Sequence, residues 1–103
     1  MRIAVAAIKK DENSEIAPQA GRASYYLIFN ETGELLEAIS NPFRIGGGGA
    51  GFGVAKMLAD KNVDAVIAEK FGMNMIGALK NRKLKYYEKR GIVKKAVEEI
   101  VKK

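Results

Sequence analysis

A run of glycines is the segment whose residue types point most directly to chemistry. Residues 46–53 read Gly-Gly-Gly-Gly-Ala-Gly-Phe-Gly and lead into an amphipathic stretch that predicts a helix from about Ala50 to Asp60. Amides without side chains let a ligand approach the backbone closely, and the first turn of a helix has unpaired N–H donors at the positive end of its dipole. The run therefore predicts a cradle for an anion, built from the backbone donors of Gly47, Gly48, Gly49, Ala50 and Gly51. The alternative is a tight passage from strand to helix in which backbone packs closely on backbone.

A second helix start and two arginines are candidates for the same site. Gly72 and Asn74 lie at the beginning of the second predicted helix, next to the cation of Lys70. Arg22 and Arg44 flank loops that the inferred topology sends to one end of the sheet, where either guanidinium could bind an oxyanion through two hydrogen bonds. The competing interpretation is a surface arginine bonded to loop carbonyls.

Residues 46–51 also satisfy the pattern G-x-G-x-x-G of dinucleotide-binding folds. In those folds the glycines follow the first strand directly, whereas residues 41–45 intervene here. Glu69 ends the following strand, roughly where an acid that binds ribose would lie. A nucleotide- or small-anion-binding module that uses the same loop is therefore the alternative function. A Walker-type phosphate loop is excluded, because Phe52 and Gly53 stand where that loop has lysine and a hydroxyl residue.

The composition restricts the chemistry further. The chain of 103 residues fits a single domain, residues 1–103, and contains no cysteine and no histidine. Disulfides, thiolate nucleophiles, imidazole bases and most zinc or iron ligation are therefore excluded. With 18 lysines and arginines against 12 acidic residues, the net charge of +6 favours an anionic partner. No apolar run approaches the ~20 residues of a membrane helix, so we expect no membrane partner and a cytoplasmic location.

Two further groups of side chains have both a functional and a structural interpretation. Residues 80–87 combine four basic side chains with two tyrosines, a composition that also occurs at nucleic-acid interfaces. Lysines on a loop between a helix and a strand are usually solvated, so a nucleic-acid partner is disfavoured. Met57, Met73 and Met75 could offer soft sulfur to copper, but methionines at helix positions usually fill the core.

Hydrophobic patterning places these residues in an α/β domain. Strands are predicted at Arg2–Ile8, Ser24–Asn30, Glu34–Ser40, Val63–Glu69 and Leu84–Glu88. Helices are predicted from about Ala50 to Asp60, from Asn74 to Lys80 and from Ile92 to Lys103. The pair Thr32-Gly33 suits a hairpin between the second and third strands, and right-handed crossovers make the later strands parallel to the first. The expected architecture is a mixed five-stranded sheet with one antiparallel strand.

Several segments together resemble the dinitrogenase iron-molybdenum cofactor biosynthesis family. The matching residues are Ile3-Ala4-Val5-Ala6, Ala20-Gly21-Arg22-Ala23-Ser24-Tyr25-Tyr26, Gly48-Gly49-Ala50-Gly51, Leu58-Ala59-Asp60-Lys61-Asn62-Val63-Asp64-Ala65-Val66-Ile67 and Phe71-Gly72-Met73-Asn74. The family includes nitrogenase accessory proteins and the orange protein, a carrier of a molybdenum–copper cluster. The resemblance implies a three-layer α/β/α fold of ribonuclease-H-like type. It also implies a non-catalytic role in binding or carrying an iron–molybdenum or molybdenum–copper sulfide cluster, or its precursor, with a cluster-donor or cluster-acceptor protein as partner.

The chain departs from this family before the glycine-arginine segment, where many members carry a histidine, and near the glycine loop, where some carry further histidines or a cysteine. Gln19 and Ala20 stand before the glycine-arginine segment, and Arg44 and Ile45 precede the glycine run, so the cargo would be held through amides, charge and shape. The implied fold also hosts two-metal nucleases, but the first strand, Arg2–Ile8, has no carboxylate to bind such metals. An edge strand that pairs with another copy would give a homodimer, which is a third class of function without any ligand.

Overall fold

Strands and helices follow one another in the order that the sequence predicts. The computed structural model describes residues 1–45 and 49–101, and within them the strands are β1 (Ile3–Ala7), β2 (Tyr25–Phe29), β3 (Leu35–Ser40), β4 (Ala65–Ala68) and β5 (Lys85–Glu88). The helices are α1 (Ala50–Asp60), α2 (Met73–Asn81) and α3 (Val93–Val101). One short 3-10 turn, η1 (Ala20–Arg22), lies between β1 and β2.

The five strands form one mixed sheet with the order β3-β2-β1-β4-β5. β1 pairs parallel with β4 and antiparallel with β2, β2 pairs antiparallel with β3, and β4 pairs parallel with β5. The predicted topology is confirmed, because β2 is the one strand that runs against the other four. All five residues of the central strand β1 are buried, which explains why that segment is continuously apolar.

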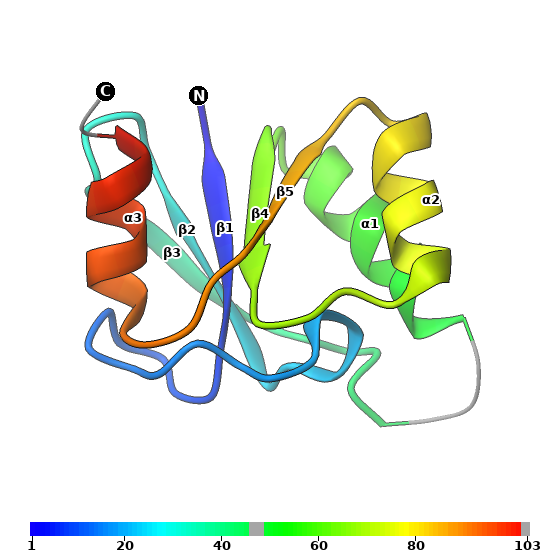
Figure 1. Ribbon diagram of the computed structural model, residues 1–103, viewed down its shortest axis with the longest axis horizontal. Coiled ribbons are helices and arrows are strands. Elements are labelled where there is room, and N and C mark those ends of the chain that lie inside the picture. Colours follow the sequence, from blue (N-terminus) through cyan, green and yellow to red (C-terminus); the bar gives the residue numbers. More distant parts are fainter. Residues whose placement is uncertain (46–48, 102–103) are drawn as a thin grey trace.

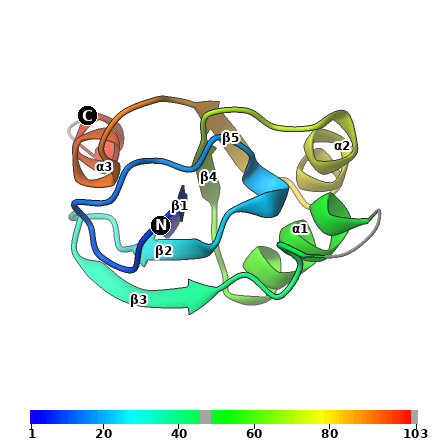
Figure 2. The ribbon, with the colours of Figure 1, turned by 90° about the horizontal axis from the view of Figure 1, so that it is seen from below.

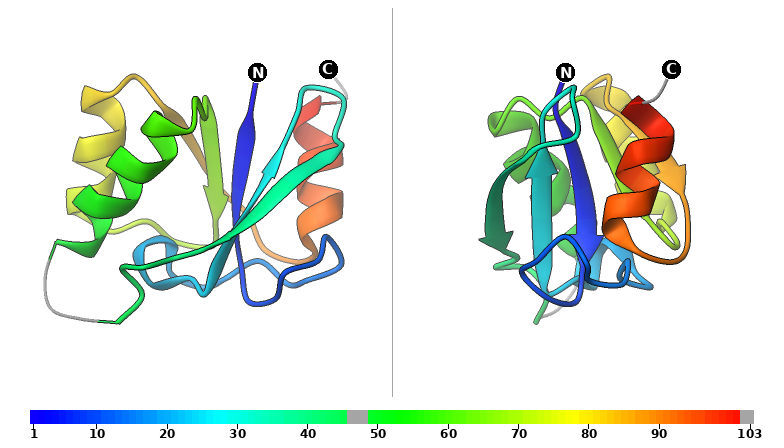
Figure 3. Two further views of the ribbon diagram at one scale, coloured as in Figure 1. Left: turned by 180° about the vertical axis from the view of Figure 1, so that it is seen from behind. Right: turned by 90° about the vertical axis from the view of Figure 1, so that its left-hand side faces the viewer.

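Helices cover both faces of the sheet, so the domain has three layers (Figures 1 and 2). Successive β1 side chains point to opposite faces: Ala4 and Ala6 pack in the core under α1 and α2, whereas Ile3, Val5 and Ala7 pack in the core under α3. Figure 3 shows α3 alone on its side of the sheet. The expected α/β/α arrangement is confirmed, and the ribonuclease-H-like name stays a prediction.

One edge of the sheet collects the segments that could bind a ligand. The carboxyl ends of β1 and β4 and the N-termini of α1 and α2 lie at the lower edge in Figure 1. β3 and β4 are consecutive in the chain but are separated in the sheet by β2 and β1, so the segment with α1 crosses over one face. This crossover brings the start of α1 next to η1 and to the start of α2 (Figure 2).

The predicted boundaries agree with the structure within a few residues. α1 begins and ends where predicted, and the hairpin turn is confirmed by Gly33, whose φ is 88° and whose amide donates to the Asn30 carbonyl at 3.0 Å. Patterning did not predict η1, because one 3-10 turn has too few residues to show a period. In the described residues, no helix has the length and apolar character needed to cross a membrane.

Candidate functional site

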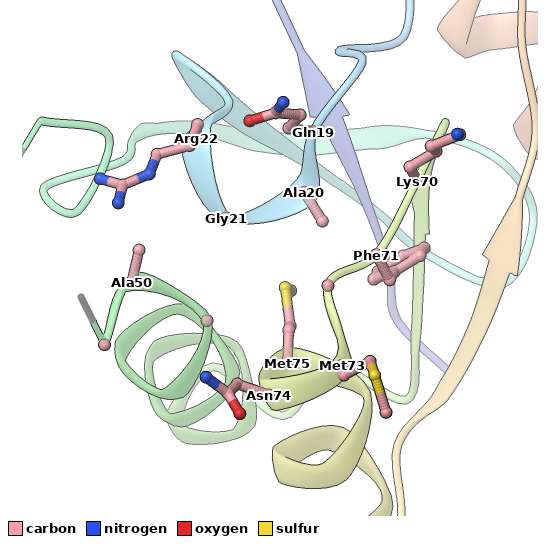
Figure 4. A pocket seen from close by; sticks show the side chains of 13 residues that line it. Gln19, Ala20, Gly21, Arg22, Ala50, Lys70, Phe71, Met73, Asn74 and Met75 are labelled. Carbon is pink, nitrogen blue, oxygen red and sulfur yellow. The ribbon is translucent and has the colours of Figure 1, made fainter. Parts of the chain in front are cut away.

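A cavity of about 470 Å³ lies at this edge of the sheet, where three chain segments meet. Its lining consists of residues 19–22 around η1, residues 49–51 at the start of α1 and residues 70–75 at the start of α2. Figure 4 shows η1 above the cavity, with the two helix starts below and beside it. The structure thus brings together six of the predicted site residues: Arg22, Gly49, Ala50, Gly51, Gly72 and Asn74.

Three other predicted site residues are not placed in the lining. Gly47 and Gly48 lie outside the described residues. Arg44 is exposed on the segment that follows β3 and does not line the cavity. Of the two predicted arginines, Arg22 is therefore the one that the fold brings to the site.

Both helix starts leave their first-turn amides without a side-chain cap. α1 is preceded by Gly49, whose φ of 90° is left-handed and suits glycine, and α2 is preceded by Gly72; neither residue offers a capping side chain. First-turn amides have no acceptor within their own helix. The Phe71 amide, one residue earlier, donates to the Glu88 carboxylate at 3.2 Å. The positive ends of α1 and α2 therefore both face the cavity, since the first residues of each helix line it.

Asn41 fixes the position of η1 relative to the segment that leads to the glycine run. Its side chain is buried, and its amide nitrogen donates to the carbonyls of Gly21 at 3.1 Å and Ala23 at 2.9 Å. Its side-chain oxygen accepts a hydrogen bond from the Phe43 amide at 2.9 Å. One side chain therefore holds the carbonyls on both sides of Arg22.

A buried tyrosine and a backbone bridge hold the other end of η1. The Tyr26 hydroxyl on β2 donates to the Ala20 carbonyl, and burial raises the pKa of this hydroxyl, which keeps it a donor. The Ala20 amide donates to the Lys70 carbonyl at 3.0 Å, which ties η1 to the segment before α2. Since the anchors Asn41 and Lys70 are distant in sequence, patterning could not place Gln19 or Ala20 in the site.

Two glycines of the run are explained by packing. A Cβ atom on Gly51 would lie 2.8 Å from the Cβ of Met75, and one on Gly53 would lie 2.5 Å from the ring of Phe43. Helix α1 can approach α2 and the Phe43 ring this closely only because both side chains are absent. At these two positions close packing explains the glycine, as in the structural alternative given in the sequence analysis. The first-turn amide of Gly51 also lines the cavity.

The charged side chains that line the cavity are both cations. Among the described residues these are Arg22 and Lys70, which lie on opposite sides of the cavity (Figure 4). Arg22 donates from Nη1 to the Phe43 carbonyl at 3.4 Å. Together with the two helix ends, these cations give the cavity a positive potential.

Methionine sulfur contributes a soft surface to the same cavity. Met75 is buried and its sulfur points from α2 toward Ala20 and Gly21, whereas Met73 is 89% exposed at the rim (Figure 4). The interpretation of the methionines as core residues is therefore wrong for Met73. Met57 is half-buried on α1 and lines a different groove.

The described residues contain no group of three or more His, Cys, Asp or Glu side chains that could hold a metal ion. The contacts that the cavity offers are backbone amides, a guanidinium, an ammonium, side-chain amides and thioethers. This set fits an anion that brings its own metal better than it fits a bare cation.

Comparison with protein families agrees with this architecture. The family model described as dinitrogenase iron-molybdenum cofactor matches residues 1–103. The chain belongs to this family. The resemblance stated from sequence is thus confirmed over the whole length. No curated protein sequence matches the chain.

Solved structures of other proteins share this fold. The apo form of the orange protein from Desulfovibrio gigas aligns with a TM-score of 0.91 at 24% identity, over 98% of this chain and 87% of that chain. A NifB-like protein from Thermotoga aligns with a TM-score of 0.82 at 29% identity, over 98% and 87%. A dinitrogenase-like protein from Methanocaldococcus jannaschii aligns with a TM-score of 0.68 at 17% identity, over 99% and 88%. At these low identities the structural matches show a shared fold alone.

Proposed function

We propose that this chain is a non-catalytic binding or carrier protein for an anionic metal cluster or its precursor, of the iron–molybdenum or molybdenum–copper sulfide type. The observation that carries the proposal is the cavity into which two uncapped helix starts open, with Arg22 and Lys70 as its charged lining side chains. Membership in the iron-molybdenum cofactor family supports a cluster as the cargo.

Each part of the lining has a role in this proposal. The first-turn amides at Gly49–Gly51 and Gly72 donate to terminal sulfur or oxygen atoms of the cargo, as helix N-termini do for other anions. Arg22 and Lys70 balance its charge. The thioethers of Met73 and Met75 contact its polarisable surface. Asn41 and Tyr26 hold η1 in place and do not touch the cargo.

Binding rather than catalysis is the proposed role because of what the lining lacks. Among the described lining residues there is no carboxylate, hydroxyl, thiol or imidazole that could act as a nucleophile or as a general acid, and the amine of Lys70 is assigned to charge balance. A carrier needs only reversible contacts, and amides and cations provide them.

The alternative is a nucleotide- or small-anion-binding module that uses the same donors. The topology disfavours a dinucleotide site, because α1 connects strands that are not neighbours in the sheet. Glu69, the candidate ribose ligand, lies 3.6 Å from Arg90 in an ion pair. A small anion such as phosphate remains the competing ligand that the experiment must separate.

Anaerobic titration of the purified protein with tetrathiomolybdate, followed by visible absorbance and calorimetry, tests the proposal. We expect saturable binding that Arg22→Gln and Lys70→Gln each weaken by about tenfold, since each removes one charged contact. Arg44→Gln and Lys95→Gln are matched controls, because these exposed cations lie outside the lining. Equal binding of molybdate, phosphate or a nucleotide would favour the small-anion module, and no binding of tetrathiomolybdate would refute the carrier.

A further inference from the structure

We propose that the outer face of α2, beside the mouth of the cavity, is a docking surface for a partner protein whose own surface is acidic. This face, named here the α2 ridge, consists of Met73, Asn74, Gly77 and Asn81 of α2 with Phe52 of α1, all of them exposed. Phe52 and Asn81 line one shallow groove, and Met73 and Asn74 line the cavity, so the ridge is continuous with the cargo site.

The composition of the ridge is that of an interface core. Met73 is 89% and Phe52 is 54% exposed, and the other members of the ridge carry no charge. Protein interfaces are depleted of charged residues at the core and enriched in aromatic residues, methionine and arginine, and their rim is polar. Lys70 before α2 and Arg82 after it supply such a rim, since both are exposed.

Gly77 is a second sign that something approaches the ridge. It lies in the middle of α2, where glycine costs about 1 kcal/mol relative to alanine. A Cβ atom placed on it would have no neighbour within 4 Å, so packing inside this chain does not require a glycine there. A partner that approaches the α2 backbone closely would require one.

The charge around the ridge decides what kind of partner fits. η1, α1, α2 and the strands and loops next to them are built by residues 16–30, 38–60 and 69–88. These segments contain eight of the 18 basic side chains and three of the 12 acidic ones, Asp60, Glu69 and Glu88. The rest of the chain holds ten basic and nine acidic side chains, so most of the excess of positive charge belongs to these segments. A partner surface with acidic residues around an apolar centre complements both features.

Other occupants fit the ridge less well. A second copy of this chain would bring the same positive segments face to face, which costs free energy. Lys80 and Arg82 are exposed cations next to the ridge, and Arg82 lines the groove with Phe52 and Asn81. A nucleic acid would need cations along the ridge itself, where Asn74, Gly77 and Asn81 are uncharged. The amides of Asn74 and Asn81 need hydrogen-bond partners, which a protein surface supplies and lipid chains do not.

The position of the ridge suggests what docking achieves. A partner seated on Met73 and Asn74 covers the rim of the cavity, so it is placed to deliver or receive the contents. This last step rests on the proposed function. Docking itself does not, and it can be measured with the protein free of cargo.

Site-directed photo-crosslinking in the native cell tests the docking surface. A photoreactive amino acid is placed at Met73, and in a matched control at Leu36, which is 45% exposed on the edge strand β3. The crosslinked protein is identified by mass spectrometry, purified, and its affinity is measured by calorimetry at low and high salt. We expect a protein crosslink at position 73 and none at 36, to a segment rich in aspartate and glutamate, with affinity that falls as salt rises.

A variant that folds at least as well as the original chain separates docking from stability. Gly77→Gln should keep or raise the thermal midpoint, since glutamine favours a helix more than glycine does, yet weaken docking by about tenfold or more. Glu98→Gln on α3 is the control and should bind as the original chain does. The proposal is overturned if position 73 crosslinks only to copies of this chain, to nucleic acid, to lipid or to nothing, or if Gly77→Gln binds with unchanged affinity. Tetrathiomolybdate binding would survive that outcome, so the two proposals fail separately.

Discussion

At the scale of single residues, Asn41 shows how a polar side chain far from the glycine run shapes the candidate site. It is 3% exposed and satisfies three backbone groups in two segments. Asn41→Asp keeps the shape but turns two donors into a carboxylate that faces the carbonyls of Gly21 and Ala23. We expect the free energy of unfolding to fall by about 3 kcal/mol in urea titrations at neutral pH, because a buried charge then faces two carbonyl oxygens and keeps the Phe43 amide as its donor.

The pH dependence of this variant gives the prediction a second measurement. Burial and the two carbonyls raise the pKa of the introduced carboxyl group in the folded state, so its loss of stability is largest above that pKa and shrinks as pH falls. The difference from the original chain should therefore be smaller near about pH 4 than at pH 7. Asn13→Asp, at an exposed position, is the control. A loss of stability that does not change with pH would contradict the assigned hydrogen bonds.

At the scale of elements, the contact between α1 and α2 sets the width of the cavity. Gly51→Ala would put a Cβ atom 2.8 Å from the Cβ of Met75 and 3.1 Å from its Cα and backbone nitrogen. Because backbone cannot rotate out of the way, the two helix starts must separate. We expect a loss of about 1–3 kcal/mol in chemical unfolding, although alanine favours a helix.

Gly77→Ala is the same substitution in the same helical layer, made where the added methyl group meets no neighbour within 4 Å. We expect it to raise the free energy of unfolding by up to about 1 kcal/mol, and the thermal midpoint by roughly 4–8 °C for each 1 kcal/mol gained. Thermal melts followed by circular dichroism measure this. If both glycine variants change stability in the same direction, the contrast in packing between the two positions is wrong.

The elements also show what the sequence could and could not predict. The sequence predicted β1, the hairpin and α1, because apolar runs and the turn at Thr32-Gly33 are local signals. It also predicted that β1, β4 and β5 are parallel, because helical crossovers are right-handed. η1 was not predicted, because Asn41 and Lys70 fix it from positions distant in sequence. For the same reason Arg22 and Arg44 looked equivalent in sequence, and only the fold separates them.

At the scale of the whole molecule, charge is distributed unevenly over a stable scaffold. The segments around the cavity and the α2 ridge hold most of the positive excess, whereas α3 on the opposite face carries two lysines and two glutamates between residues 94 and 99. Like charges held together at a binding site reduce stability in exchange for affinity. The cavity should therefore be a place where removing a charge makes the free protein more stable.

Lys70→Gln tests this exchange in the protein without ligand. Lys70 shares the cavity lining with Arg22 and two positive helix ends, so its removal relieves repulsion. At about 0.01 M salt, where screening extends over ~30 Å, we expect a higher midpoint of urea unfolding than for the original chain, by less than about 1 kcal/mol of stability. At about 1 M salt, where the screening length is ~3 Å, the difference should vanish.

Lys95→Gln on α3 is the control for this prediction. Because Glu98 and Glu99 lie close by in the helix, it should show no gain at low salt. A gain for Lys70→Gln that persists at high salt would point to packing instead of repulsion, and a loss at low salt would contradict the positive potential assigned to the cavity.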